Sequence, residues 1–179
     1  MAAAAAFVVF LAARGDLDLS TSEAGIAPPA PAQTSAAGSL GPIVLRAAQL
    51  RARAGTLREP VYWIGPRAGR AYELGRTADG KVSVRYVRPG APPGAADENA
   101  IVVGTYPSKN AYARAKRAVA SSPSLVYRDL RDGGFAVVDP DRPRSVFVAY
   151  PKLDYQIEVF DPIPGEAQQL VLSKLARVG

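Results

Sequence analysis

The chain has 179 residues, about the size of one domain, and its 48% apolar and 21% charged residues are ordinary for a globular protein. It contains no cysteine and no histidine, which excludes disulfides, thiolate nucleophiles, Cys- or His-ligated metals and the Ser-His-Asp triad. The net charge is +6, and residues 43–93 concentrate it, with ten basic residues against three acidic ones.

The chain begins with an uninterrupted apolar run, Ala2 to Ala13. Twelve helical residues span about 18 Å, too short for a bilayer core but typical of the apolar region of a signal peptide. No basic residue precedes the run, and Leu11 is a poor fit to a cleavage site. Three interpretations stay open: a leader or anchor with a misassigned start, a complete but short one, or an Ala-rich segment of no targeting function. We expect residues 1–13 to be a leader or anchor.

Residues 14–42 are rich in Ala, Pro, Ser, Thr and Gly and lack an apolar period, which predicts a disordered linker. The folded domain is expected to span residues 43–179. Its first element is a predicted helix that starts behind Pro42, buries one stripe of apolar residues and stops at Gly55. That stripe contains Ile43, Val44, Ala47, Leu50 and Ala54.

Strands dominate the rest of the domain. Asp79-Gly80 between two alternating runs predicts a hairpin of residues 70–77 and 81–88. Ser108 is the expected N-cap of a middle helix, and Pro164-Gly165-Glu166 is expected to open a last helix that includes Val178. The other predicted strands cover residues 61–64, 101–106, 125–130, 135–138, 146–150 and 155–160.

This order predicts an α+β fold with a mostly antiparallel sheet and about three helices packed on it, in the simplest case on one face. The two halves also echo each other. Residues 61–66 are similar to 146–151, and Tyr106-Pro107 and Phe160-Asp161-Pro162 each precede a predicted helix. The echo is consistent with a strand–hairpin–strand–helix pseudo-repeat, although short β patterns also recur by chance.

Three segments resemble a group of small exported or membrane-anchored proteins from actinobacterial-type genomes, which has no assigned activity. They are EPVYWIGPRAGRAYELGRT, VVGTYPSKNAY and SVFVAYPKLDYQIEVFDP. The resemblance covers about residues 57–179. It implies export and a single α+β domain, and it supplies no catalytic residue.

Arginines are the main candidates for a binding site. Five of them lie in or beside the first hairpin: Arg67, Arg70, Arg76, Arg85 and Arg88. Arginine forks recognise phosphate and carboxylate, so the cluster predicts an anion site for lipid headgroups, an acidic envelope polymer or nucleic acid. The competing interpretation is a solvated surface in an arginine-rich chain. Glu73 lies between these arginines and is expected to form a cross-strand ion pair.

The aromatic residues of the same region alternate with arginine, as in single-strand nucleic-acid platforms. They are Tyr62, Trp63, Tyr72 and Tyr86. No ribonucleoprotein-type motif accompanies them, and core packing is the preferred interpretation.

Carboxylates are the only classical acid–base groups left. The candidates are Asp129 with Asp132, Asp139 with Asp141, and Asp154, Glu158 and Asp161. Such pairs can hydrolyse glycosides or bind a hard cation, but turn chemistry explains most of them. Glycine-rich phosphate loops are absent, and we expect no cofactor and no metal.

The sequence therefore predicts an extracytoplasmic, membrane-anchored or secreted module of the cell envelope, with a binding or structural rather than enzymatic role. Its partners would be an anionic envelope polymer, lipid headgroups or an envelope protein. The alternatives are a basic cytosolic protein that binds nucleic acid through residues 43–93, and a carboxylate-based hydrolase.

Overall fold

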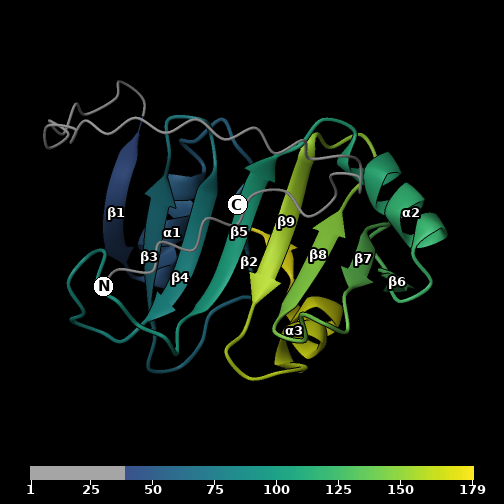
Figure 1. Cartoon of the computed structure of the whole chain (residues 1–179). Helices are drawn as coiled ribbons and strands as arrows, with labels where there is room; N and C mark the ends of the chain where they lie inside the picture. The colour runs from purple at the N-terminus through teal and green to yellow at the C-terminus, as the bar shows by residue number, and fades with distance from the viewer. Residues whose placement is uncertain (1–38) are drawn as a thin grey trace, which may run out of the picture. The chain divides into compact units, whose positions relative to one another are not determined.

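The computed structural model describes residues 39–179, whose framework is one eight-stranded antiparallel sheet (Figure 1). The strands lie in the order β1-β3-β4-β5-β9-β8-β7-β6. With three helices, this confirms the predicted α+β fold. The strands are β1 (Leu40–Leu45), β3 (Ala71–Arg76), β4 (Val82–Val87), β5 (Ile101–Pro107), β6 (Val126–Asp129), β7 (Phe135–Val138), β8 (Ser145–Ala149) and β9 (Tyr155–Phe160).

Two four-stranded units of the same topology make up the sheet. The strands β1, β3, β4 and β5 pair in chain order and lead into helix α2 (Ala111–Ser121). The strands β6 to β9 do the same and lead into α3 (Glu166–Lys174). The units join through antiparallel β5 and β9, where Val103 lies opposite Val159. The chain is thus a pseudo-repeat at the level of topology.

The sequence echo identified this repeat only in part. The strands that end at Tyr106-Pro107 and at Phe160 are equivalent, and a helix follows each. The proposed equivalence of residues 61–66 with 146–151 is wrong. The first segment forms β2 (Tyr62–Trp63), which pairs outside the sheet with β10 (Ala176–Arg177), whereas the second forms β8 inside it.

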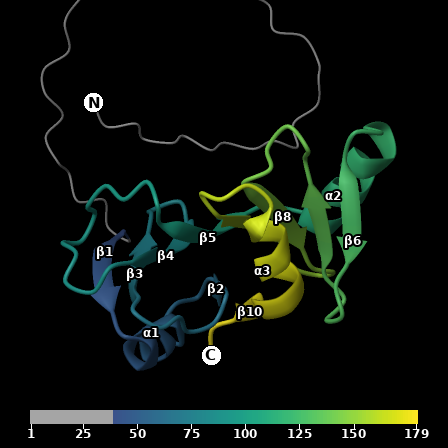
Figure 2. The ribbon, with the colours of Figure 1, turned by 90° about the horizontal axis from the view of Figure 1, so that it is seen from below.

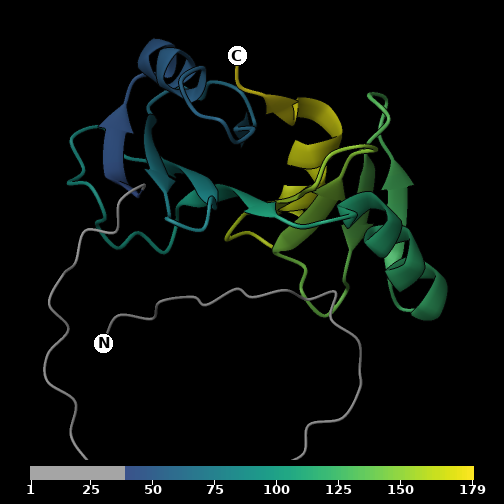
Figure 3. The ribbon, with the colours of Figure 1, turned by 90° about the horizontal axis from the view of Figure 1, so that it is seen from above.

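The main core lies between one face of the sheet and a layer made of α1 (Ala47–Ala54), α3 and the β2–β10 pair (Figures 2 and 3). Leu50 of α1 is fully buried there against sheet residues that include Leu74, Val84 and Ile157. Burial of one such side chain stabilises the fold by about 1.5–3 kcal/mol. This burial therefore helps to hold α1 over the first unit of the sheet.

Helix α2 covers the opposite face of the sheet, so the prediction that the helices share one face is wrong (Figure 3). Its Ala111 and Ala115 pack on Phe135 and Val137, whereas Ala136 between them belongs to the main core. Strand β7 has apolar side chains on both of its faces, so both faces must be packed against other elements.

The prediction starts the first helix too early. Residues 40–45 form β1 instead, with Val44 opposite Glu73 on β3, and α1 starts at Ala47. Pro42 is tolerated because β1 is an edge strand. The predicted stop at Gly55 is confirmed. The folded part thus begins at Leu40, inside the stretch expected to be linker.

The other helix boundaries are also set by distant contacts. Ser108 is not an N-cap: Asn110 takes that place in the left-handed region at φ +55°, and its N–H donates to Asp154 Oδ1 at 2.8 Å. Helix α3 begins at Glu166 as predicted but ends at Lys174. Val178 lies beyond it, where its N–H donates to the Val61 carbonyl.

The predicted hairpin is confirmed by six consecutive residue pairs between β3 and β4. Gly80 in its turn adopts φ +79°, a conformation that favours glycine.

The leader expected at residues 1–13 and most of the linker lie outside the described residues. Among residues 39–179, no helix is long and apolar enough to cross a membrane.

Candidate anion-binding site

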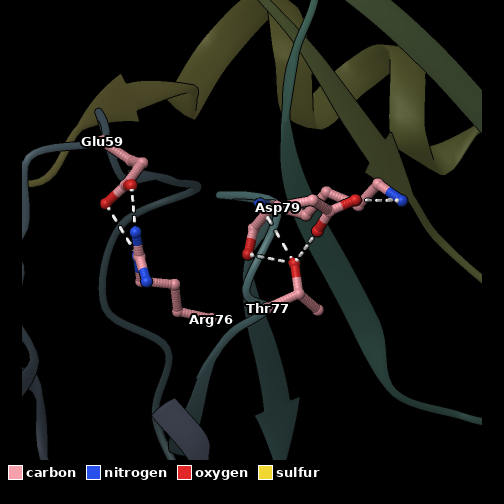
Figure 4. A network of polar contacts seen from close by, with 5 residues as sticks. Glu59, Arg76, Thr77 and Asp79 are labelled. Carbon is pink, nitrogen blue, oxygen red and sulfur yellow. Dashed lines mark hydrogen bonds and ion pairs between the residues drawn. The ribbon is translucent and has the colours of Figure 1, made fainter. Parts of the chain in front are cut away.

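Two of the five predicted anion-binding arginines are already paired. Arg76 on β3 makes a two-point contact with Glu59, through Nη2–Oε1 at 2.6 Å and Nε–Oε2 at 3.0 Å (Figure 4). Glu59 is buried, and the hydrogen bond from Arg76 holds the pKa of that carboxyl below its ordinary value. Arg76 therefore compensates a buried charge.

Arg85 has the same kind of role on the other face of the sheet. Its Nη1 donates to Glu73 Oε1 at 2.6 Å, directly across from β4 to β3, as expected for Glu73. The pair also holds the loop that follows β4. Arg85 donates to the Ala95 carbonyl, and Glu73 accepts the Gly94 N–H. Arg85 therefore has a structural role in the hairpin and in the loop that follows it.

Asp79, the third acidic residue of this region, is paired with Lys81 at 2.8 Å and accepts a hydrogen bond from Thr77 (Figure 4). The Lys81 and Thr77 hydrogen bonds lower the pKa of Asp79 to about 2. All three acidic residues between positions 43 and 93 are thus neutralised locally. Seven of the ten basic residues remain, and within residues 39–179 they make no ion pair: Arg46, Arg51, Arg53, Arg58, Arg67, Arg70 and Arg88.

Three of these seven arginines line one shallow hollow of about 500 Å³. Arg46 directly precedes α1, and Arg67 and Arg70 lie in the loop between β2 and β3. The rest of the wall is mostly apolar and comes from Ala47, Pro66, Ala68, Gly69, Ala71, Tyr72 and Pro89. The hollow therefore offers an anion several cationic donors without a competing carboxylate in its wall.

Two buried tyrosines hold the loop that carries Arg67 and Arg70. The Tyr86 hydroxyl accepts from the Ile64 N–H at 2.9 Å and donates to the Gly65 carbonyl at 3.0 Å. The Tyr72 hydroxyl accepts from the Arg67 N–H at 2.8 Å. Burial raises the pKa of Tyr86, so its hydroxyl stays protonated and keeps donating.

The loop conformation depends on glycine as well. Gly65 and Gly69 have φ values of +73° and +68°, which other residues rarely adopt. The backbone of the arginine loop is thus fixed by turn geometry and by hydrogen bonds from the sheet. Its positions are set before a ligand arrives, which lowers the entropic cost of binding.

Arg46 is the site residue that the sequence did not identify. It lies on the polar side of the predicted helix, and that pattern cannot show which loop the helix start faces.

Arg88 is exposed and lies just beyond the Ala71–Val87 pair, next to the lining residue Pro89. Of the five predicted residues, the structure brings together Arg67 and Arg70 and places Arg88 beside them, whereas Arg76 and Arg85 form ion pairs with Glu59 and Glu73.

The aromatic residues of the region are core residues, as preferred from the sequence. Tyr62, Trp63, Tyr72 and Tyr86 are all less than 10% exposed. Trp63, Tyr72 and Tyr86 form successive edge-to-face contacts, and Tyr62 stacks on Tyr150. They present no open platform on which bases could stack.

The candidate carboxylates each have a partner other than another carboxylate, apart from Asp129, which is exposed on the edge strand β6, and Asp141, which is exposed in the loop between β7 and β8. Glu158 is buried and accepts from Ser145 Oγ at 2.8 Å and from the Tyr106 hydroxyl at 3.3 Å. Asp132 accepts from the Tyr150 hydroxyl. The remaining three, Asp139, Asp154 and Asp161, each accept a backbone N–H. In the described part of the chain, no acidic cluster is arranged to hold a metal ion.

Comparison with family models, with curated proteins and with solved structures gives no match for this chain. The site is therefore interpreted from its own geometry.

Proposed function

We propose that this protein is a non-enzymatic binding module that holds a phosphate- or carboxylate-bearing ligand in the hollow lined by Arg46, Arg67 and Arg70. One observation carries the proposal. Every acidic residue between positions 43 and 93 is paired with Arg76, Lys81 or Arg85. The three arginines of the hollow, in contrast, make no ion pair in the described part of the chain.

The chemistry of the hollow suits a phosphodiester or phosphomonoester best. Planar guanidinium groups offer paired donors to phosphate oxygens, and the apolar wall can contact the carbon skeleton of the ligand. The hollow is next to the start of α1, whose first turn contains no acidic residue, and a helix start favours an anion. The ligand source is a lipid headgroup or an anionic envelope polymer.

The proposed place of action is the extracytoplasmic side of the membrane. The apolar run of residues 2–13, the Pro/Ala/Ser-rich stretch that follows and the resemblance to small exported proteins support it. Protease accessibility of a C-terminal tag in intact cells tests this location, with lysed cells as the control. A tag protected until lysis contradicts it.

Binding is tested with two matched double variants of the full chain. Arg67→Gln/Arg70→Gln removes two charges from the hollow, and Arg53→Gln/Arg58→Gln removes two unpaired charges outside it. Vesicles of 30% phosphatidylglycerol in phosphatidylcholine probe a headgroup, and soluble polyphosphate probes a polymer. We expect the first variant to lose at least about tenfold in affinity and the second to lose less than about threefold. Equal losses would contradict a defined site.

Nucleic acid binding is the second candidate, because the seven arginines without an ion pair give the region a strong positive potential. A nucleic-acid ligand predicts affinity for single-stranded DNA that falls steeply with salt, as phosphate contacts release counterions. It also predicts equal losses for the two double variants, since the charge is then used collectively.

A further inference from the structure

A second basic surface lies on helix α2, apart from the hollow that Arg67 and Arg70 line. Residues 99–127 contain four basic residues and no acidic one. Arg114, Lys116 and Arg117 belong to α2, and Lys109 lies just before it. Lys109, Lys116 and Arg117 are exposed, and within residues 39–179 they make no ion pair. Helix α2 therefore carries positive charge that the fold does not neutralise.

The outward side of α2 is a strip of alanine and basic side chains. Four exposed residues recur every three or four positions and so share this side of the helix: Ala113, Lys116, Arg117 and Ala120. The opposite side of the helix packs on strand β7 through two buried alanines. The outward strip thus presents cations beside short side chains, which allow an extended ligand to lie close to the helix.

Lys116 is positioned before a ligand arrives. Its Nζ lies 5.0 Å from the centre of the Tyr112 ring and 5.4 Å from the centre of the Phe135 ring. A cation over aromatic rings keeps its charge, and Lys116 stays exposed. Asp154 bonds to the start of the helix, where it accepts the Asn110 N–H, but within residues 39–179 it makes no ion pair with the strip. The charge of the strip is therefore open to an anion.

The side chains of the strip indicate the kind of anion. Helices that lie in a membrane interface bury large apolar side chains in the lipid, whereas the outward side of α2 has alanine beside its cations. Single-stranded nucleic acids stack their bases on aromatic side chains, and the strip contains none. Its chemistry suits a polymer of phosphate groups that is bound through charge alone.

The strip and the arginine hollow lie on different faces of the sheet (Figure 3). The hollow is beside α1 and β3, whereas α2 packs on the other face over β7. Four strands separate β3 from β7 in the sheet, which at about 4.8 Å per strand places them roughly 24 Å apart. A flat bilayer contacts one of these surfaces at a time, and a single phosphate group cannot reach both. A flexible chain can.

We propose that the outward side of α2, with Lys109, Lys116 and Arg117, is a second phosphate-binding surface. The ligand is then a flexible polymer of phosphate groups that occupies this surface and the arginine hollow together. The inference rests on the proposed function of the hollow and names the class of its ligand. A ligand that joins two weak sites binds more tightly than either site alone, once it is long enough to span them.

Titration calorimetry of the full chain with tripolyphosphate and with long-chain polyphosphate tests the proposal. Lys116→Gln/Arg117→Gln removes two charges from α2, and Lys174→Gln/Arg177→Gln removes two exposed charges outside both surfaces. We expect the α2 variant to lose at least about tenfold in affinity for the long chain and less than about twofold for tripolyphosphate. Equal losses of long-chain affinity in the two double variants would overturn the second surface.

The short ligand separates this inference from the proposed function. Arg67→Gln/Arg70→Gln should weaken the binding of both polyphosphates, and unchanged tripolyphosphate binding in this variant contradicts the hollow. Wild-type affinity of Lys116→Gln/Arg117→Gln for the long chain, with tripolyphosphate still bound through the hollow, contradicts only the surface on α2. The circular dichroism spectra and melting temperatures of the variants should match those of the wild type, because the replaced side chains form no ion pair within residues 39–179.

Two further ligands test the class of the polymer. Phosphatidylglycerol vesicles should bind Lys116→Gln/Arg117→Gln as tightly as the wild type, because a bilayer at the hollow does not reach α2. Equal loss of vesicle binding in the α2 and hollow variants contradicts the polymer. Single-stranded DNA with the same number of phosphates should bind no more tightly than polyphosphate, and an affinity at least about tenfold higher would overturn the proposal in favour of nucleic acid.

Discussion

Glu73 and Arg85 face each other across β3 and β4, with 2.6 Å between the carboxylate and the guanidinium. Glu73 retains 5% of its side-chain surface and Arg85 retains 22%. The pair joins two strands and, through Gly94 and Ala95, the loop that follows them. Most of the charge that the sequence places in the hairpin thus serves the fold.

Arg85→Gln should destabilise the protein by about 3 kcal/mol, because it leaves the Glu73 carboxylate buried without a counter-charge. The exposed Arg88→Gln should cost less than about 0.5 kcal/mol. Urea unfolding near neutral pH measures both. The double variant Glu73→Gln/Arg85→Gln should recover part of the loss, since both charges are then removed. A cost for Arg85→Gln as small as that for Arg88→Gln would show that the pair contributes little.

Glu158 should make stability depend on pH. Burial raises the pKa of this carboxyl in the folded protein, in spite of its hydrogen bonds to Ser145 and Tyr106. The folded state therefore binds this proton more tightly than the unfolded state. The contribution of Glu158 is fully present below the unfolded pKa of about 4.5 and is lost as pH rises through the folded pKa.

The variant Glu158→Gln tests this sign. Its free energy of unfolding, relative to that of the wild type, should increase as pH rises above about 4.5. The full gain is about 1.4 kcal/mol for each unit by which folding raises the pKa of Glu158. Urea unfolding between pH 4 and 8 measures the difference. The exposed Glu166→Gln serves as the control. A difference for Glu158→Gln that does not change with pH would contradict the raised pKa of this buried carboxyl.

Gly104 should not accept a side chain. A Cβ at this position would overlap the Tyr106 hydroxyl and lie 2.6–2.7 Å from two ring carbons. Gly104→Ala should therefore displace Tyr106 from Glu158 and cost about 1–3 kcal/mol. The matched change Gly75→Ala, whose nearest contact is Ser83 Oγ at 3.4 Å, should cost less. Thermal unfolding compares the two, and equal melting temperatures would show that Tyr106 moves aside at no cost.

Tyr72→Phe should weaken anion binding without touching an arginine of the hollow. It removes the hydroxyl that holds the Arg67 N–H, which loosens the loop and leaves that backbone group unpaired. We expect a loss of about 1 kcal/mol in stability and about threefold to tenfold in affinity for the phosphatidylglycerol vesicles. Tyr62→Phe, which leaves the loop hydrogen bonds intact, is the control. Unchanged affinity of Tyr72→Phe would show that the loop geometry does not matter for binding.

The candidate site shows where sequence reasoning reaches its limit. Alternation along the hairpin was sufficient to predict a cross-strand ion pair for Glu73, because both partners lie on one hairpin, and the structure identifies the partner as Arg85. The partner of Arg76 was not predictable in this way. Glu59 lies 17 residues earlier, outside any strand, and reaches Arg76 only because the main core brings its segment over the sheet.

The sequence by itself determined the fold class, the hairpin turn at Gly80, and the excess of arginine over acid in residues 43–93. Those features depend on local turn geometry, side-chain alternation and composition. Only the tertiary structure decided which arginines remain unpaired, that β2 pairs with β10, and that α2 covers the second face of the sheet. Those outcomes depend on which surfaces meet in the folded chain, and β2 and β10 meet across more than 100 residues.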